Sequence, residues 1–344
     1  VPANTGTTAT LQAELRGYAK GSGIALSDAG SGVCHQVMSE GVVRPGTVVV
    51  GADSHTCTLG AFGAFATGVG ATDMAAIWAS GATWFRVPET IAVHLSGRLS
   101  GAAEPKDVAL ACVARLGMEG ATYRALEFAG EGAAGISMDG RLTLCNMAVE
   151  TGAKTGLFYA DAVTVRYLAS YGLAASPQAP EDCRCERTLD IDLADVVPLV
   201  AVPHRVDTVR EAEDLAGTHL DQVFVGTCTN GRYEDLARFA RIVRGRKVAV
   251  RTLVVPASRA VLSRAIATGV LADIVDAGCM VATPGCGPCL GAHAGVLGEG
   301  EVCLSTANRN FKNRMGVGGE IYLSSVATAA ASAIAGEIAV PEAV

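Results

Sequence analysis

Three cysteines lie in glycine-flanked turns, and this arrangement constrains the chain more than any other feature of its sequence. Cys286 and Cys289 lie in the stretch 283–293, TPGCGPCLGAH, and Cys228 lies upstream in 226–232, GTCTNGR. Glycine allows tight turns in which an inorganic group approaches the backbone closely. Thiolates suit iron–sulfur clusters or zinc, and three of them on a four-iron cluster leave one iron without a protein ligand. Such an iron can act as a Lewis acid.

Two other interpretations of these cysteines stay open. The sequence Cys-Gly-Pro-Cys at 286–289 is also typical of a redox-active dithiol, whose reactive thiol lies at a helix N-terminus. That interpretation gives Cys228 no role. A structural zinc site has acceptable ligands in Cys228, Cys286, Cys289 and His293.

The composition excludes several classes of protein. Half of the 344 residues are hydrophobic, only 18% are charged and the formal net charge is −7, so a basic surface for nucleic acid is not expected. No apolar run reaches membrane-spanning length, and no signal peptide is visible. The 11 cysteines do not have the density of a small disulfide-bonded domain, which favours a reducing compartment. We therefore expect a cytoplasmic protein that binds neither nucleic acid nor membrane.

A second group of polar residues follows an apolar run near the N-terminus. The stretch 47–56, TVVVGADSHT, predicts a buried strand that ends at Asp53, Ser54 and His55. Ligands of open α/β sheets bind beyond the carboxyl ends of the strands, so these side chains lie where chemistry is usually done. The simpler interpretation is a helix cap followed by a surface histidine. Upstream, a turn that begins with glycine presents His35, which on spacing alone is a structural residue.

The remaining pattern predicts alternating strands and helices. Helices are expected at 5–23, 72–84 and 105–116, with Trp78 and Trp84 in the core. A further helix would place Asn146 and Glu150, four residues apart, on one face. A linker is expected at 205–218, and after it short strands alternate with helices, which indicates parallel sheets with covered faces.

Three motifs together resemble those of a known family. They are GTCTNG at 226–231, PGCGPC at 284–289 and NRNFKNR at 308–314. They resemble the cluster-binding and substrate-binding motifs of the aconitase superfamily, and most of all the large subunits of 3-isopropylmalate dehydratase and homoaconitase. The resemblance implies an α/β fold of three α/β/α domains, with parallel or mixed sheets, around a central cluster cleft. We expect the domains at 1–88, 89–204 and 205–344, with the cluster cysteines in the last.

The resemblance also implies roles for individual residues. A [4Fe-4S] cluster would be bound by Cys228, Cys286 and Cys289. The acid–base network would consist of His35, Asp53, His55 and Glu150. Substrate would be bound by Ser54, Asn146, Asn308, Arg309 and Arg314. The implied reaction dehydrates and rehydrates a small hydroxy polycarboxylate, with 3-isopropylmalate favoured over homoaconitate.

The ends of the chain suggest a partner. The sequence begins at Val1 without methionine, and the family's N-terminal segment with an Asp-His pair is expected before it. The chain stops soon after a predicted helix at 324–335, so the mobile swivelling domain of the family would be a separate small subunit, in a heterodimer or heterotetramer. The alternatives of a different class are a dithiol oxidoreductase and an iron-sensing protein that binds RNA, and the acidic charge argues against the second.

Overall fold

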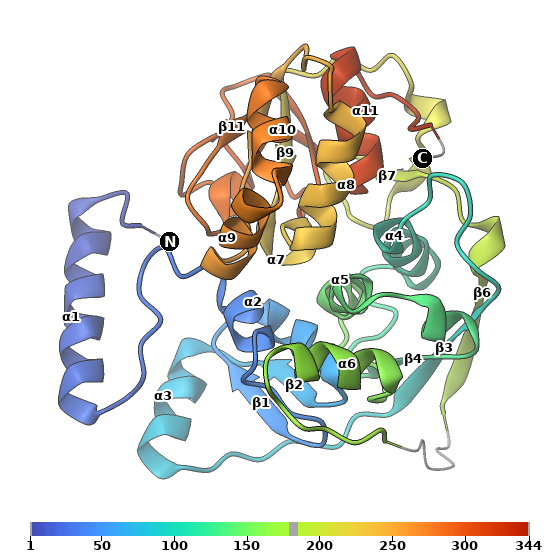
Figure 1. Cartoon of the computed structure of the whole chain (residues 1–344). Helices are drawn as coiled ribbons and strands as arrows, with labels where there is room; N and C mark the ends of the chain where they lie inside the picture. Colours follow the sequence, from blue (N-terminus) through green and yellow to red (C-terminus); the bar gives the residue numbers. More distant parts are fainter. Residues whose placement is uncertain (1, 179–184, 343–344) are drawn as a thin grey trace.

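A seven-stranded sheet forms the C-terminal half of the computed structural model, which describes residues 2–178 and 185–342 (Figure 1). Its strand order is β11-β10-β9-β12-β13-β7-β8. The parallel strands are β9 (Gln222–Val225), β10 (Arg251–Val254), β11 (Met280–Val281), β12 (Val302–Ser305) and β13 (Glu320–Ser324). An antiparallel edge is formed by β7 (Leu199–Ala201) and β8 (Val209–Glu211). Parallel strands point the same way, so the turns after β9, β11 and β12 meet at one edge of the sheet.

Each face of this sheet has its own core. Val223 and Val225 pack with the helices, whereas Phe224 between them packs with the rest of the molecule, because successive side chains of a strand point to opposite faces. The covering helices are α8 (Tyr233–Val243), α9 (Arg259–Ala267), α10 (Val270–Asp276) and α11 (Val326–Ala335). The alternation of strands and helices expected from the sequence is therefore confirmed.

A second sheet has four parallel strands in the order β5-β4-β3-β6. They are β3 (Thr90–Ser96), β4 (Ala125–Ala129), β5 (Thr155–Leu157) and β6 (Arg187–Asp192). Three helices accompany them, α4 (Pro105–Leu116), α5 (Met138–Ala148) and α6 (Ala162–Ser170). Helix α4 begins where the sequence predicts, because Pro105 suits a first helical position and Asp107 accepts a hydrogen bond from the backbone N–H of Glu104.

The N-terminal part forms a third, smaller unit. Its two parallel strands, β1 (Val48–Gly51) and β2 (Phe65–Gly68), are joined by the 3₁₀ helix η1 (Ser54–Phe62). Almost all of η1 is buried, and it packs against α5 and β5 of the second unit. The short helix α2 (Cys34–Ser39) lies beside η1. The residues that follow β1 therefore point toward the centre of the molecule.

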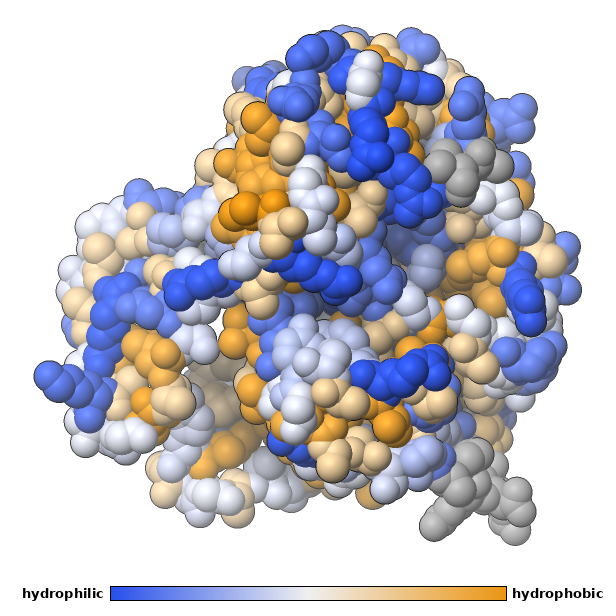
Figure 2. All heavy atoms as spheres, in the orientation of Figure 1, coloured by the Kyte–Doolittle hydropathy of each residue, from blue (hydrophilic) through white to orange (hydrophobic). Residues whose placement is uncertain are grey.

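Two predictions about this unit are wrong. Trp78 and Trp84 are 58% and 84% exposed instead of buried. Trp78, on α3 (Ala71–Ser80), stacks at 6.1 Å on Tyr18 of α1 (Gly6–Ser22), and α1 stands away from the body (Figure 1). Figure 2 shows hydrophobic side chains on the surface of these helices. Strand β1 is also half-exposed, in a sheet that has two strands within the described residues.

Two smaller differences concern chain segments. The predicted linker contains strand β8, whose hydrogen bonds to β7 are not visible in a polar sequence. Helix α5 ends at Ala148, so Glu150 lies in a following 3₁₀ turn, η3 (Val149–Thr151). The division at residues 88 and 204 stays a prediction. Within the described residues, no helix combines the length and the apolar character that crossing a bilayer requires.

Candidate active site

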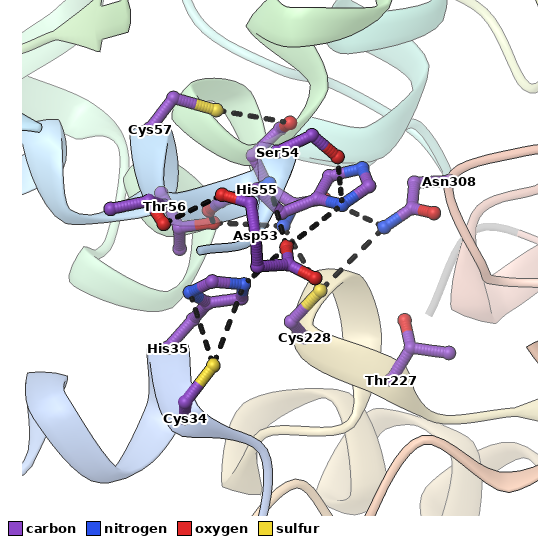
Figure 3. Close-up of polar contacts among 12 residues, drawn as sticks. Cys34, His35, Asp53, Ser54, His55, Thr56, Cys57, Thr227, Cys228 and Asn308 are labelled. Atoms are coloured by element: carbon purple, nitrogen blue, oxygen red, sulfur yellow. Dashed lines mark hydrogen bonds and ion pairs between the residues drawn. The ribbon is translucent and has the colours of Figure 1, made fainter. Parts of the chain in front are cut away.

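One side of the site is a network of histidines and carboxylates. Asp53 begins η1, and its Oδ1 accepts a hydrogen bond of 2.8 Å from the backbone N–H of His55. The same oxygen lies 2.9 Å from Nε2 of His35, which α2 presents from the other direction (Figure 3). The hydrogen bonds from both histidines hold the pKa of Asp53 far below its ordinary value. Burial lowers the pKa of His35, but the hydrogen bonds to Asp53 and Cys34 outweigh burial and raise it to about 9.

The network continues to a buried glutamate and an arginine. Nε2 of His55 lies 2.9 Å from Oε1 of Glu150. Arg309 donates from Nε to both carboxylate oxygens of Glu150, at 2.8 and 3.1 Å. Ser54 lies beside the same ring, with its Oγ 3.4 Å from Nδ1 of His55. The side chain of Glu150 is only 3% exposed, and its charge is balanced by the guanidinium.

The three cysteines form the other side of the site. Cys228 lies in α7 (Thr227–Asn230), directly after β9, and Cys286 and Cys289 flank the start of η6 (Gly287–Leu290) after β11. Burial raises the pKa of all three thiols, and burial together with negative charge on Cys289 raises the pKa of Cys286 to about 12. Charge on Cys286 and Cys289 likewise raises the pKa of Cys228. Negative charge on neighbouring thiolates thus opposes the ionisation of Cys228 and Cys286, and a bound cation would reverse that effect.

Glycine makes the approach of these turns possible. Gly287, between the paired cysteines, has a φ of +52°, and a Cβ there would lie 3.0 Å from the ring of Phe224. A Cβ on Gly226 would lie 2.9 Å from the carbonyl oxygen of Val255. A side chain at either position would push a cysteine turn off the sheet edge.

Two asparagines reach the cysteine sulfurs. Nδ2 of Asn146, from α5, lies 3.2 Å from Sγ of Cys228. Nδ2 of Asn308, after β12, lies 3.6 Å from the same sulfur (Figure 3). Oδ1 of Asn308 lies 3.9 Å from Sγ of Cys289. Asn308 also donates to Oδ1 of Asn146 at 3.2 Å, which locks the two amides together. These contacts join α5 of the four-stranded-sheet unit to the seven-stranded-sheet unit at the cysteines.

Arg314 lies beside the cysteines with a spare donor. Burial raises the pKa of Cys289, whereas the charge of Arg314 and the hydrogen bond from its side chain lower it. The Nε of Arg314 is one of four buried side-chain polar atoms without a hydrogen-bond partner among the described residues. A buried unpaired donor is costly, whereas a carboxylate bound there would satisfy it.

The structure brings all of the predicted site residues together, although they come from segments far apart in sequence. It also adds Arg232, which is fully buried and donates to the backbone oxygens of Cys228 and Thr229, fixing the α7 turn. Arg232 is part of the stretch 226–232, but sequence reasoning assigned it no role. An arginine next to so many small residues is the signal that could have identified it.

Comparison with known proteins gives the class of the chain. A sequence model described as "Aconitase family (aconitate hydratase)" matches residues 4–217 and 204–336. The chain belongs to the aconitase family, and it is accordingly an enzyme of the hydro-lyase type, as the sequence predicted.

Individual relatives are close over almost the whole chain. A probable methanogen homoaconitase large subunit from Methanosarcina mazei is 53% identical over 99% of this chain and 88% of its own length. A 3-isopropylmalate dehydratase large subunit from Archaeoglobus fulgidus is 51% identical over 94% of this chain and 79% of its own length. A homoaconitase large subunit from Thermus thermophilus is 49% identical over 99% of this chain and 82% of its own length.

A solved structure shows the same fold at low identity. The holo-form of aconitase X from Thermococcus kodakaraensis superposes with a TM-score of 0.52 over 89% of this chain and 72% of its own length. Only 13% of the sequence is identical, so this likeness concerns the fold alone. The expected aconitase-like α/β architecture is confirmed.

Proposed function

We propose that this chain is the large subunit of a dehydratase that removes water from a malate-type hydroxy acid and adds it back at the neighbouring carbon. The observation that carries the proposal is the meeting of two groups at one sheet edge. The continuous network of His35, Asp53, His55, Glu150 and Arg309 lies opposite three thiols, two of them buried and one half-buried. Proton-transfer groups and soft metal ligands are the two requirements of this reaction.

We propose a [4Fe-4S] cluster bound by Cys228, Cys286 and Cys289. The donor set fits this group because it consists of buried and half-buried thiols, with two amide donors aimed at the sulfur of Cys228. Each cysteine of a four-iron cluster binds a different iron, so the sulfurs need not converge on one point. In the described part of the chain, no three His, Cys, Asp or Glu side chains are grouped to hold a single metal ion. When bound, such a cluster supplies an iron without a protein ligand, which polarises a hydroxyl and a carboxylate.

The chain's own residues would bind substrate and move protons. Arg314 would bind one substrate carboxylate with its unpaired Nε, and Arg309, already held by Glu150, would orient a second. Glu150 and His55 share a hydrogen bond, so a proton can pass between them and the departing or entering oxygen. Asp53 keeps His35 protonated at neutral pH, which makes His35 a hydrogen-bond donor to that oxygen.

We propose that the substrate is 3-isopropylmalate. The chain would act on it together with a separate small subunit that carries the swivelling domain. Homoaconitate is the second candidate, because relatives of similar identity have either name. 3-Isopropylmalate and homocitrate, the hydroxy acid that dehydrates to homoaconitate, present the same malate core to the arginines. The group that differs, isopropyl or a carboxylate arm, would contact the small subunit. We also propose the division into three domains at residues 88 and 204.

The deciding experiment uses anaerobically reconstituted protein with candidate small subunits from the same genome. The absorbance of the alkene is followed with isopropylmalate and with homocitrate, and turnover of isopropylmalate only in the presence of a small subunit is expected. Turnover of homocitrate alone would replace the substrate, and full activity without a second protein would refute the two-subunit proposal. Thiol–disulfide exchange that persists without iron would favour the dithiol alternative.

A further inference from the structure

Lys106 is a buried lysine that the mechanism above does not use. It lies in the first turn of α4, and only 1% of it is exposed. Its Nζ donates to the backbone oxygens of Thr306 at 2.9 Å and Ala307 at 2.7 Å, and lies 3.5 Å from Oδ1 of Asn230. All three acceptors belong to the sheet unit that carries the cysteines, about 124 to 201 residues further along the chain.

The stability of α4 does not explain this lysine. A cation in the first turn of a helix opposes the helix dipole, and a buried ammonium must recover its lost hydration from hydrogen bonds. Lys106 meets both costs only through acceptors outside its own helix. The side chain therefore contributes to the junction between α4 and the segment after β12.

That segment carries two site residues. Thr306 and Ala307 directly precede Asn308, which contacts Cys228, and Arg309, which pairs with Glu150. Since the peptide units are rigid, fixing two successive carbonyls limits the directions that the next two side chains can take. No other side-chain donor to these two carbonyls is present among the hydrogen bonds of the described residues.

We propose that Lys106 is a positioning residue that sets Asn308 and Arg309 against the cysteines and Glu150, and that places a cation behind the three-thiolate site. Burial lowers the pKa of Lys106 to about 7, but negative charge on Asp107, Asp235, Cys289 and Cys228 opposes this shift. Only the second statement, that Lys106 places a cation behind the three-thiolate site, rests on the proposed cluster.

The first test needs no cluster. In metal-free protein, hydrogen exchange of the backbone amides in 302–315 is compared between wild type, Lys106→Met and Arg238→Met. Arg238 is a matched control, because it pairs at 3.1 Å with Glu104, next to the same helix start. Exchange roughly tenfold faster is expected in Lys106→Met only. Wild-type exchange in that variant, or equal acceleration in Arg238→Met, would overturn the positioning role.

The second test uses reconstituted protein. The rate at which a chelator removes iron should rise about 10- to 100-fold in Lys106→Met, the usual effect of losing a group behind a metal site. The cluster's reduction potential should fall, because a nearby cation stabilises the more negative reduced form. Arg238→Met should match wild type in the rate of iron removal and in the reduction potential. If both values were unchanged in Lys106→Met, the proposal that Lys106 places a cation behind the three-thiolate site would be refuted.

Two outcomes need separate readings. If Lys106→Met does not fold, Lys106→Gln replaces it, since an amide keeps a donor without the charge. The backbone amides of 302–315 should then exchange hydrogen faster in Lys106→Gln than in wild type. Exchange at the wild-type rate would overturn the positioning role. If wild type itself binds no cluster, the proposed function fails, whereas the exchange experiment still decides the positioning role.

Discussion

The two sides of the site differ in how far they are assembled before any metal binds. On the histidine side, each charged group already has a partner, from His35 through Asp53 and Glu150 to Arg309. On the sulfur side, burial raises the pKa of all three thiols, which opposes their ionisation. We infer that the histidine side is preorganised, whereas the sulfur side would acquire its charge only when the proposed cluster binds.

The largest effect is expected from removing one thiol. Cys228→Ser should prevent assembly of the roughly four irons per chain that a three-thiolate cluster implies, and lower activity by about 1000-fold or more, because Lewis-acid stabilisation is worth several kcal/mol. Iron analysis and steady-state assays measure this. Cys303→Ser is the control, because Cys303 is buried within β12 and donates to the backbone oxygen of Leu304. Loss of iron in that variant too would mean that a fourth thiolate closes the site.

A change on the histidine side should lower turnover without removing iron. Glu150→Gln should reduce kcat by roughly 100- to 1000-fold, since an amide cannot accept and return a proton. Iron content should equal that of wild type. Asp161→Asn is a matched control, because Asp161 also pairs with an arginine, Arg141 at 2.6 Å, but outside the site. If Glu150→Gln lost its iron, the two sides would not be independent.

A smaller effect is expected where the two sides meet the substrate. Arg314→Lys should lower kcat/KM by roughly tenfold or more, because a carboxylate paired with arginine contributes about 1.5–3 kcal/mol and lysine lacks the planar fork. The cluster's spectrum should not change. Arg251→Lys, which alters a cation paired with Glu301 at 2.9 Å elsewhere on the sheet, should have normal kinetics. Wild-type kinetics in Arg314→Lys would assign this side chain to structure.

The smallest effect concerns stability and pH. The pKa of His35 is raised in the folded state, to about 9, so its contribution is complete below about pH 6.5 and is lost as pH rises through 9. When the pH is raised from 6.5 to 9.5, the unfolding free energy of wild type should fall by about 1–2 kcal/mol more than that of Asp53→Asn. This difference is smaller than the pKa shift alone would give, because Asp53 is half-exposed and solvent screens the pair.

Denaturant unfolding of metal-free protein at both pH values measures this difference. Asp221→Asn, which alters the exposed pair of Asp221 and His219, should follow wild type. If the unfolding free energy changed equally with pH in wild type and in Asp53→Asn, the pair of His35 and Asp53 would not stabilise the fold.

Local sequence was enough to predict much of the architecture. Glycine-flanked cysteines after apolar runs, and a proline with a capping aspartate before α4, are signals that act within a few residues. The family motifs identified which side chains to expect in the site. Where a helix had no visible partner, prediction failed, because the periodicity of α3 shows a hydrophobic face but not whether anything covers Trp78.

What the sequence by itself determined about this protein is therefore its class, its alternating elements and its candidate ligands. Only the tertiary structure decided that Asn146 donates to Cys228, 82 residues away, and that Lys106 donates to the carbonyl of Ala307, 201 residues away. Contacts between residues so distant depend on how sheets and helices pack, and packing leaves no pattern in the residues on either side of each partner.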